Sequence, residues 1–168
     1  MTAPTAYHQI GKFVVYFQHV ETAINEILVL LVNADNEAIL ILVNELEYSQ
    51  RLKTAVVMLA RSVDLQHEPD LSAKAEFHSL MGELRSLGER RNDLVHSNYT
   101  QWFNVEGAPG LIRQNSKLRG SKGIREEDEE KLLPESFNTD FERLDGALQR
   151  LEAFRLKAID WRYPNEAV

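Results

Sequence analysis

The sequence predicts an all-α fold, a bundle of four to five helices with a small hairpin-and-loop insertion between the third and fourth long helices. Apolar residues recur at alternating steps of three and four along four long stretches, the spacing that gives a helix one buried face. Strand-forming residues, by contrast, gather in one short stretch, residues 99–113. We expect one domain over residues 1–168, with the insertion at about 97–135, because a chain of this length builds a single core.

Composition limits the function classes open to this chain. Cysteine is absent, which excludes disulfides, thiolate zinc sites and cysteine nucleophiles, and is compatible with a reducing cytoplasm. The net charge of −7 argues against non-specific coating of nucleic acid, although a small, focused RNA site remains open. The amino terminus lacks a signal-peptide pattern, and the longest apolar runs are too short to span a bilayer. We therefore expect a cytoplasmic protein that does not enter a membrane.

The first predicted helix has the clearest pattern. Its apolar stripe lasts about three heptads, which is typical of a helix packed lengthwise in a bundle. The stripe consists of Ile10, Phe13, Phe17, Val20, Ile24, Ile27 and Leu31. Residues 33–36 indicate a break, and the continuously apolar segment 38–43 fits either a strand or a short buried helix.

Two further long helices are expected at residues 49–65 and 70–96. Pro69 lies at the boundary between them, and Asp70 is favourable at the positive end of the second helix dipole. The buried face of the first consists of Leu52, Ala55, Val56, Leu59 and Val63. The stripe of the second consists of Phe77, Leu80, Leu84, Leu87, Arg91 and Leu94, so an arginine stands where an apolar residue is expected.

The pattern changes after residue 96. Residues 99–105 favour a strand, 106–110 a turn and 111–113 a returning strand. The polar segment 115–123 predicts a mobile loop, and the acidic run 126–130 predicts a solvated segment.

A last helix is expected after Pro134. Thr139 and Glu142 have the spacing of a capping box at its start. Its apolar face consists of Phe141, Leu144, Leu148, Leu151, Phe154 and Ala158.

The stretch from Arg91 to His96, at the end of the third long helix, is the strongest candidate for a functional site. An arginine on a face expected to be buried needs a carboxylate, a phosphate or a second protein surface beside it. Taken alone, Arg91 is equally consistent with a structural ion pair, for example with Glu21. His96 alone is consistent with a helix-terminal histidine favoured by the dipole, and Asn92 with a surface amide.

Taken together, the three side chains suit metal-independent cleavage of an RNA phosphodiester. Histidine titrates near neutrality, so His96 can act as base or acid. Arg91 can hold a phosphate and stabilise the charge of the transition state, while Asn92 can orient His96 or a phosphate oxygen. One histidine cannot easily be base and acid in one step, and residues five apart lie about 140° apart around a helix. We therefore expect a dimer in which Arg91 and His96 come from different subunits.

A helical domain of this size with Arg-Asn-x-x-x-His near the end of its third helix resembles the HEPN family (higher eukaryote and prokaryote nucleotide-binding). The family motif falls on Arg91, Asn92 and His96, although Arg90 and His96 also fit its spacing. The resemblance implies a metal-independent endoribonuclease that acts as a homodimer, of the kind found in toxin–antitoxin, abortive-infection and phage-defence systems. It implies RNA as substrate and an antitoxin protein as a partner. Some members are inactive, so the alternative is a non-catalytic helical interaction or nucleotide-binding module.

Two other groups of side chains are candidates for contact with RNA. A basic segment either grips phosphates or is a solvated loop, and it contains Lys117, Arg119, Lys122 and Arg125. Three aromatic residues either stack on bases or pack the hairpin onto the bundle: Tyr99, Trp102 and Phe103. The histidines lack metal-ligand spacing and the glycines match no phosphate-cradling loop, so we expect no metal and no cofactor.

Overall fold

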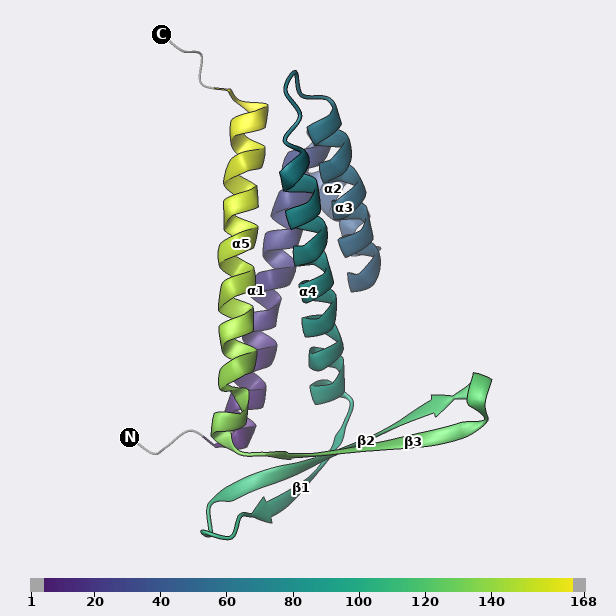
Figure 1. Ribbon diagram of the computed structural model, residues 1–168, viewed down its shortest axis with the longest axis vertical. Helices are drawn as coiled ribbons and strands as arrows, with labels where there is room; N and C mark the ends of the chain where they lie inside the picture. The colour runs from purple at the N-terminus through teal and green to yellow at the C-terminus, as the bar shows by residue number, and fades with distance from the viewer. Residues whose placement is uncertain (1–4, 165–168) are drawn as a thin grey trace.

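The computed structural model describes residues 5–164, and most of that length is helical, as the sequence predicts. Four long helices lie side by side (Figure 1): α1 (Ala6–Val32), α3 (Tyr48–Asp64), α4 (Leu71–Val95) and α5 (Asn138–Arg162). The helix α1 packs against α5 and α3, and α4 packs against the same two helices, so the four enclose one core. A fifth, shorter helix, α2 (Asn36–Asn44), flanks α1.

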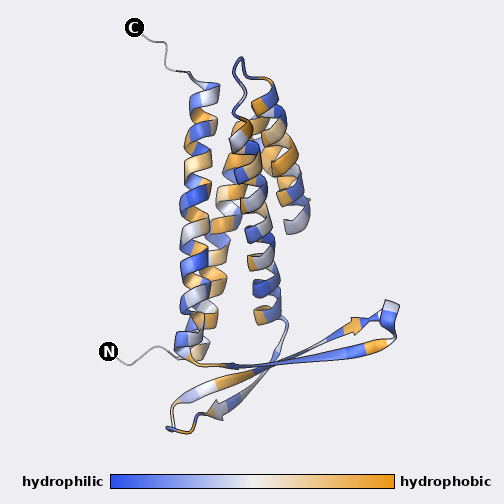
Figure 2. Ribbon diagram, in the orientation of Figure 1, coloured by the Kyte–Doolittle hydropathy of each residue, from blue (hydrophilic) through white to orange (hydrophobic). Residues whose placement is uncertain are grey.

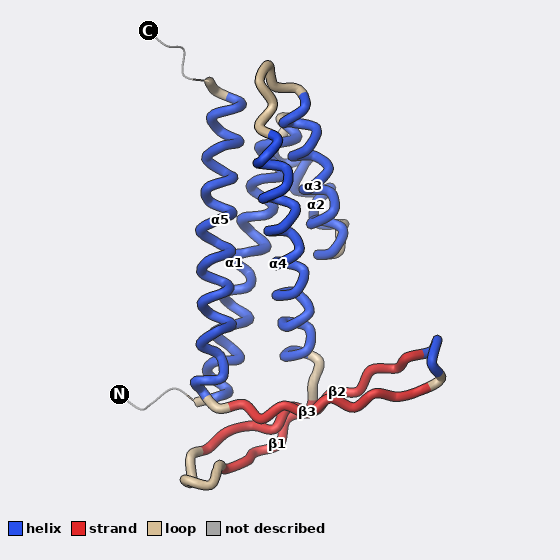
Figure 3. Tube along the Cα trace, in the orientation of Figure 1, coloured by secondary structure: helices blue, strands red, loops and turns tan. Residues whose placement is uncertain are grey.

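The purely helical class is not confirmed, because a three-stranded antiparallel sheet crosses one end of the helices (Figure 3). Its strand order is β1 (Asn98–Phe103), β2 (Pro109–Arg119) and β3 (Ile124–Leu132). The predicted hairpin is confirmed as β1 and the start of β2. The predicted mobile loop is wrong, since those residues belong to a second hairpin, β2–β3, closed by the short helix η1 (Gly120–Lys122). The acidic run is a part of β3, and none of its residues is buried.

Charge pairing across the strands explains this second hairpin. The register places Arg113 opposite Glu130, with which it forms an ion pair, and Arg119 pairs with Glu126 across the same two strands. Opposite charges on facing residues stabilise an antiparallel pair. The acidic run is therefore one side of a charged ladder, and the basic residues before it are the other side.

The boundaries of α1 and α2 settle the ambiguous apolar segment as a helix. Asn33 ends α1 in the left-handed conformation, with φ of 53°. Asp35 then caps α2, because its carboxylate accepts a hydrogen bond of 2.8 Å from the Ala38 amide. The helix buries only Ile39 and Val43.

The predicted capping box at the start of the last helix is wrong. The short helix η2 (Pro134–Phe137) runs directly into α5, whose N-cap residue Phe137 makes no side-chain capping bond. Thr139 therefore already lies inside the first turn. Pro134 fits the start of η2, where its missing N–H is not needed.

The predicted apolar stripes supply most of the buried core of the bundle. Figure 2 shows apolar residues recurring along the helices. Their largest fully buried members include Phe13, Phe77, Leu59 and Leu84. Among residues 5–164, α1 is long and apolar enough to cross a membrane by length and composition, a test that core helices of soluble proteins also pass. Here its stripe packs against α3 and α5.

The contact between α3 and α4 depends on a glycine. The Tyr48 hydroxyl donates a hydrogen bond of 2.8 Å to the Leu84 carbonyl oxygen, which holds the ring across Gly88. A Cβ atom at Gly88 would lie 2.5 Å from the Tyr48 ring. No real contact is that short, so the ring or the helix must move to admit one.

Replacing Gly88 with alanine is expected to lower the free energy of unfolding by about 1–3 kcal/mol, because overpacking outweighs the better helix propensity of alanine. The matched control is Gly82→Ala on the same helix, where a Cβ meets nothing within 4 Å and should stabilise by up to about 1 kcal/mol. Urea denaturation of both variants measures the difference. Equal stability of the two would contradict the packing argument.

Candidate active site at the end of helix α4

The motif residues lie where α4 ends and the sheet begins. Arg91 and Asn92 occupy the last turn, and His96 is the C-cap residue, whose N–H donates to the Asn92 carbonyl at 3.0 Å. Asn92 and His96 are exposed and Arg91 is half-buried. The guanidinium of Arg91 donates a 3.1 Å hydrogen bond to the side-chain oxygen of Asn92. The structure thus brings Arg91 and Asn92 together, while the His96 side chain bonds to neither of them.

The structural ion pair that the sequence suggested for Arg91, with Glu21, does not form. Within residues 5–164, Arg91 makes no ion pair with Glu21 or with another carboxylate. Its helical position is also less buried than the stripe predicts, because Leu87 and Leu94 occupy the core side of these turns. Arg91 therefore keeps most of its hydrogen-bond donors available.

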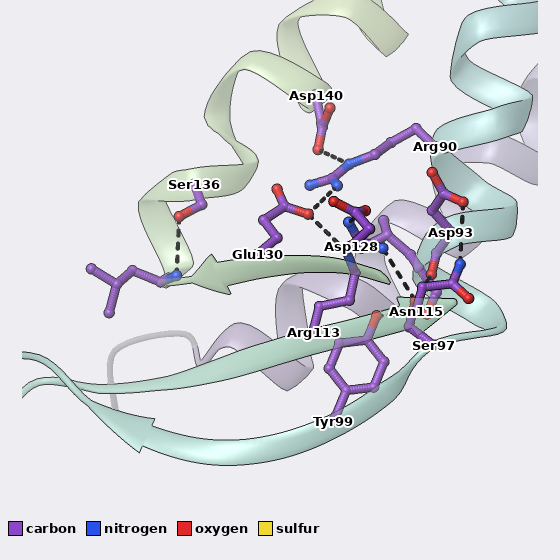
Figure 4. Close-up of polar contacts among 12 residues, drawn as sticks. Arg90, Asp93, Ser97, Tyr99, Arg113, Asn115, Asp128, Glu130, Ser136 and Asp140 are labelled. Atoms are coloured by element: carbon purple, nitrogen blue, oxygen red, sulfur yellow. Dashed lines mark hydrogen bonds and ion pairs between the residues drawn. The ribbon is translucent and has the colours of Figure 1, made fainter. Parts of the chain in front are cut away.

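The neighbouring Arg90 is instead the structural arginine of this helix. Its Nε donates to Asp140 at 2.9 Å and its Nη1 donates to Glu130 at 2.6 Å (Figure 4). The same Glu130 oxygen accepts a 2.8 Å hydrogen bond from Arg113, which also donates to Ser97 at 3.2 Å and pairs with Asp128. These contacts, the Glu130 network, join α4, β2, β3 and α5.

Burial and charge reinforce this network. The Arg113 side chain is only 4% exposed, a position that an arginine occupies only with partners. Burial alone would raise the pKa of the Glu130 carboxyl, but the hydrogen bonds from Arg90 and Arg113 outweigh it and hold that pKa below its usual range. The network fixes the end of α4 against the sheet. It also occupies Arg90, so Arg91 is the arginine of the two that is available for chemistry.

His96 faces a groove between the end of α4 and the β2–β3 hairpin. Its volume is about 460 Å³, within the range of small-ligand sites. Amides and a hydroxyl form the β2 side, and charged side chains form the β3 side. The groove is lined by His96, Asn98, Gln114, Asn115, Ser116, Arg125, Glu127, Asp128 and Glu129.

The three predicted RNA-binding cations all have carboxylate partners in the chain. Lys117 lies 2.8 Å from Asp93 on α4, and Arg119 donates to Glu126 at 2.7 Å. Lys122 lies 3.9 Å from the other oxygen of Glu126. They belong to β2 and η1, and their pairing leaves little uncompensated positive charge for a phosphate.

The sequence left open whether the three aromatic residues stack on bases or pack the hairpin onto the bundle, and the structure shows that they differ in exposure. Tyr99 packs against the core and its hydroxyl donates to the Leu94 carbonyl at 2.6 Å. Trp102 is half-buried, with the Lys131 ammonium 5.2 Å from its ring centre. Phe103, however, is 63% exposed and does not hold the sheet to the bundle.

Nothing in the described part of the chain groups three or more histidine, aspartate or glutamate side chains as metal ligands would be grouped. Comparison of the chain with models of protein families, with curated proteins and with solved structures found no match. The assignment of a function therefore depends on the motif and on the geometry of its surroundings.

Proposed function

We propose that this chain is a metal-independent endoribonuclease of the HEPN type that cleaves RNA by attack of the 2′-hydroxyl in a composite dimer site. One observation supports the proposal most. Arg91 is half-buried at a helix end and makes no ion pair with a carboxylate within residues 5–164. The N–H groups of Arg91 that Asn92 does not use are therefore open to a phosphate or to a second protein surface.

The contact between Arg91 and Asn92 prepares a set of donors. Because the Asn92 oxygen accepts from Arg91, the Asn92 amide group is turned so that its N–H bonds are left to donate. Arg91 contributes further N–H groups beside it. Neighbouring donors, one of them cationic, suit the oxygens of a phosphodiester and the charge that builds on them in the transition state.

His96 supplies proton transfer in this proposal. It is exposed at the C-cap, one turn beyond Asn92, and faces the groove. One copy takes the proton of the 2′-hydroxyl and the second copy protonates the leaving 5′-oxygen, so two copies complete the reaction. We place the protein in the cytoplasm, as a toxin or phage-defence effector restrained by an antitoxin protein.

A second candidate function is a non-catalytic interaction module. The observation in its favour is the internal pairing of Lys117, Arg119 and Lys122, which leaves little positive charge at these three positions for RNA. In this case Arg91 contacts a partner protein, and the chain does not cleave RNA.

Cleavage of a mixed RNA in the presence of EDTA separates the two. The nuclease proposal expects products with 2′,3′-cyclic phosphate ends and a loss of about 100- to 1000-fold in rate for Arg91→Ala. Because Arg91 has no ion pair among the described residues, the free energy of unfolding of that variant should lie within about 0.5 kcal/mol of the wild-type value.

The matched control is Arg85→Ala, an exposed arginine on the same helix, which should cleave as wild type does. Absence of cleavage by the wild-type chain, or full activity of Arg91→Ala, would reject the nuclease proposal.

A further inference from the structure

The two edges of the sheet differ sharply in charge. The outer strands are β1 and β3, and each presents unpaired backbone groups on one side. Seven of the nine residues of β3 are charged, which is the usual protection of an edge against pairing with another strand. The strand β1 carries no charge and no proline. Its sequence, Asn-Tyr-Thr-Gln-Trp-Phe, is rich in residues that favour strands.

The register identifies the backbone groups on the open edge of β1. The Asn104 N–H donates to the Ala108 carbonyl at 3.0 Å, and the same register pairs Trp102 with Gly110 and Thr100 with Ile112. Hydrogen bonding alternates along an antiparallel strand. Tyr99, Gln101 and Phe103 therefore direct their N–H and C=O groups away from β2.

The side chains near this edge are exposed and uncharged. Phe103 is 63% exposed and Val105 is fully exposed, while Thr100 and Gln101 also lie at the surface. In Figure 3, β1 lies on the side of the sheet away from the helices. Within residues 5–164, no strand pairs with this edge.

We propose that β1 pairs antiparallel with β1 of a second copy of this chain, with the dyad at Gln101, and so joins the two sheets into one. In this register the three residues with outward backbone groups bond to one another, because Gln101 faces Gln101 and Tyr99 faces Phe103. Thr100 faces Trp102. Tyr99 with Phe103 is an aromatic pair, and Thr100 with Trp102 joins a β-branched residue to an aromatic one. Both combinations stabilise facing strands, and no like charges meet.

This contact is distinct from the composite nuclease dimer and does not rest on it. Asn98, the first residue of β1, precedes Gln101 by three residues, and His96 lies two residues earlier, at the end of α4. At about 3.3 Å per residue, the two Asn98 residues would stand roughly 20 Å apart across the β1 pair, on opposite sides of the dyad. The two contacts therefore use different surfaces, and variants can disrupt them separately.

Molar mass in solution, compared with 19.3 kDa for one chain, tests the proposal. Gln101→Pro removes one outward N–H and leaves the β1–β2 ladder intact, since proline is tolerated at such an edge position. Light scattering should show its mass to be half that of wild type. Gln101→Lys, which sets two ammonium groups against each other at the dyad, should have the same effect while keeping the backbone donor.

The matched control is Glu127→Pro, since the register directs the Glu127 N–H to the open side of β3, and its mass should equal that of wild type. Hydrogen exchange gives a second readout: the Tyr99, Gln101 and Phe103 amides should gain protection as protein concentration rises. A monomeric wild type, or wild-type mass in folded Gln101→Pro and Gln101→Lys, would overturn the proposal.

Discussion

His96→Ala is expected to abolish cleavage of RNA while leaving the fold unchanged. The side chain is exposed at the C-cap of α4, and no other histidine lines the groove. Without it, the proposed site keeps the phosphate-binding donors of Arg91 and Asn92 but has no group to move protons near neutral pH. The measurement is the initial cleavage rate in EDTA, together with the melting curve of each variant.

The control for this result is His78→Ala. His78 is an exposed histidine on the same helix, several turns away from the groove, and its loss should change neither rate nor stability. Retention of full activity by His96→Ala would remove the proposed proton-transfer group and with it the composite site. Equal loss of activity in both variants would show that the loss is not specific to the histidine in the groove, and would contradict the proposed role of His96 as well.

Glu130→Ala is expected to lower the free energy of unfolding by about 3 kcal/mol, because it removes the carboxylate shared by two arginines with little exposure to solvent. Arg113 and Arg90 would each lose a hydrogen bond to a charged acceptor. The control is Glu129→Ala, the adjacent residue on the exposed side of β3, which should cost at most about 1 kcal/mol. Chemical denaturation of both variants gives the comparison.

Glu130 also makes the stability of the fold depend on pH in the acid range. The pKa of Glu130 is lower in the folded chain than its ordinary value of 4.5. Its contribution to stability is therefore complete above that ordinary value and is lost as the pH falls through the folded value. The melting temperature of wild type should drop over this range more steeply than that of Glu130→Gln, which cannot titrate there. Parallel curves for the two proteins would contradict the assignment.

The helices could be predicted from sequence because their signal is local. The stripes of α1, α3, α4 and α5 are sequences of apolar residues at helical spacing, and no knowledge of the partner is needed to recognise them. The second hairpin has no such signal. Its strands are held by pairs such as Arg113 with Glu130, and before the pairing is known, the acidic run looks like any solvated segment.

In the candidate site, the local pattern could not show which of two arginines, Arg90 or Arg91, is buried and ion-paired. Leu87 and Leu94 are seven apart, and a residue between them continues the stripe at either position 90 or position 91. The sequence favoured Arg91 for the buried position, whereas the structure gives the ion pairs to Arg90. Only the distant residues Glu130 and Asp140 decide between the two, and nothing in the motif specifies them. The pairing of Lys117 with Asp93 could not be predicted for the same reason, because the two residues are far apart in the sequence.

The β2–β3 hairpin extends well beyond the helices (Figure 1), and the Glu130 network and the Lys117–Asp93 pair hold only its inner part. Its far end contains η1 and solvent-exposed pairs such as Arg119 with Glu126, whose energies are small. The hairpin is thus an arm anchored at one end. Residues can be added, lost or exchanged at its tip without disturbing the bundle, so the reach and charge of the arm can diverge between related chains while the end of α4 stays fixed.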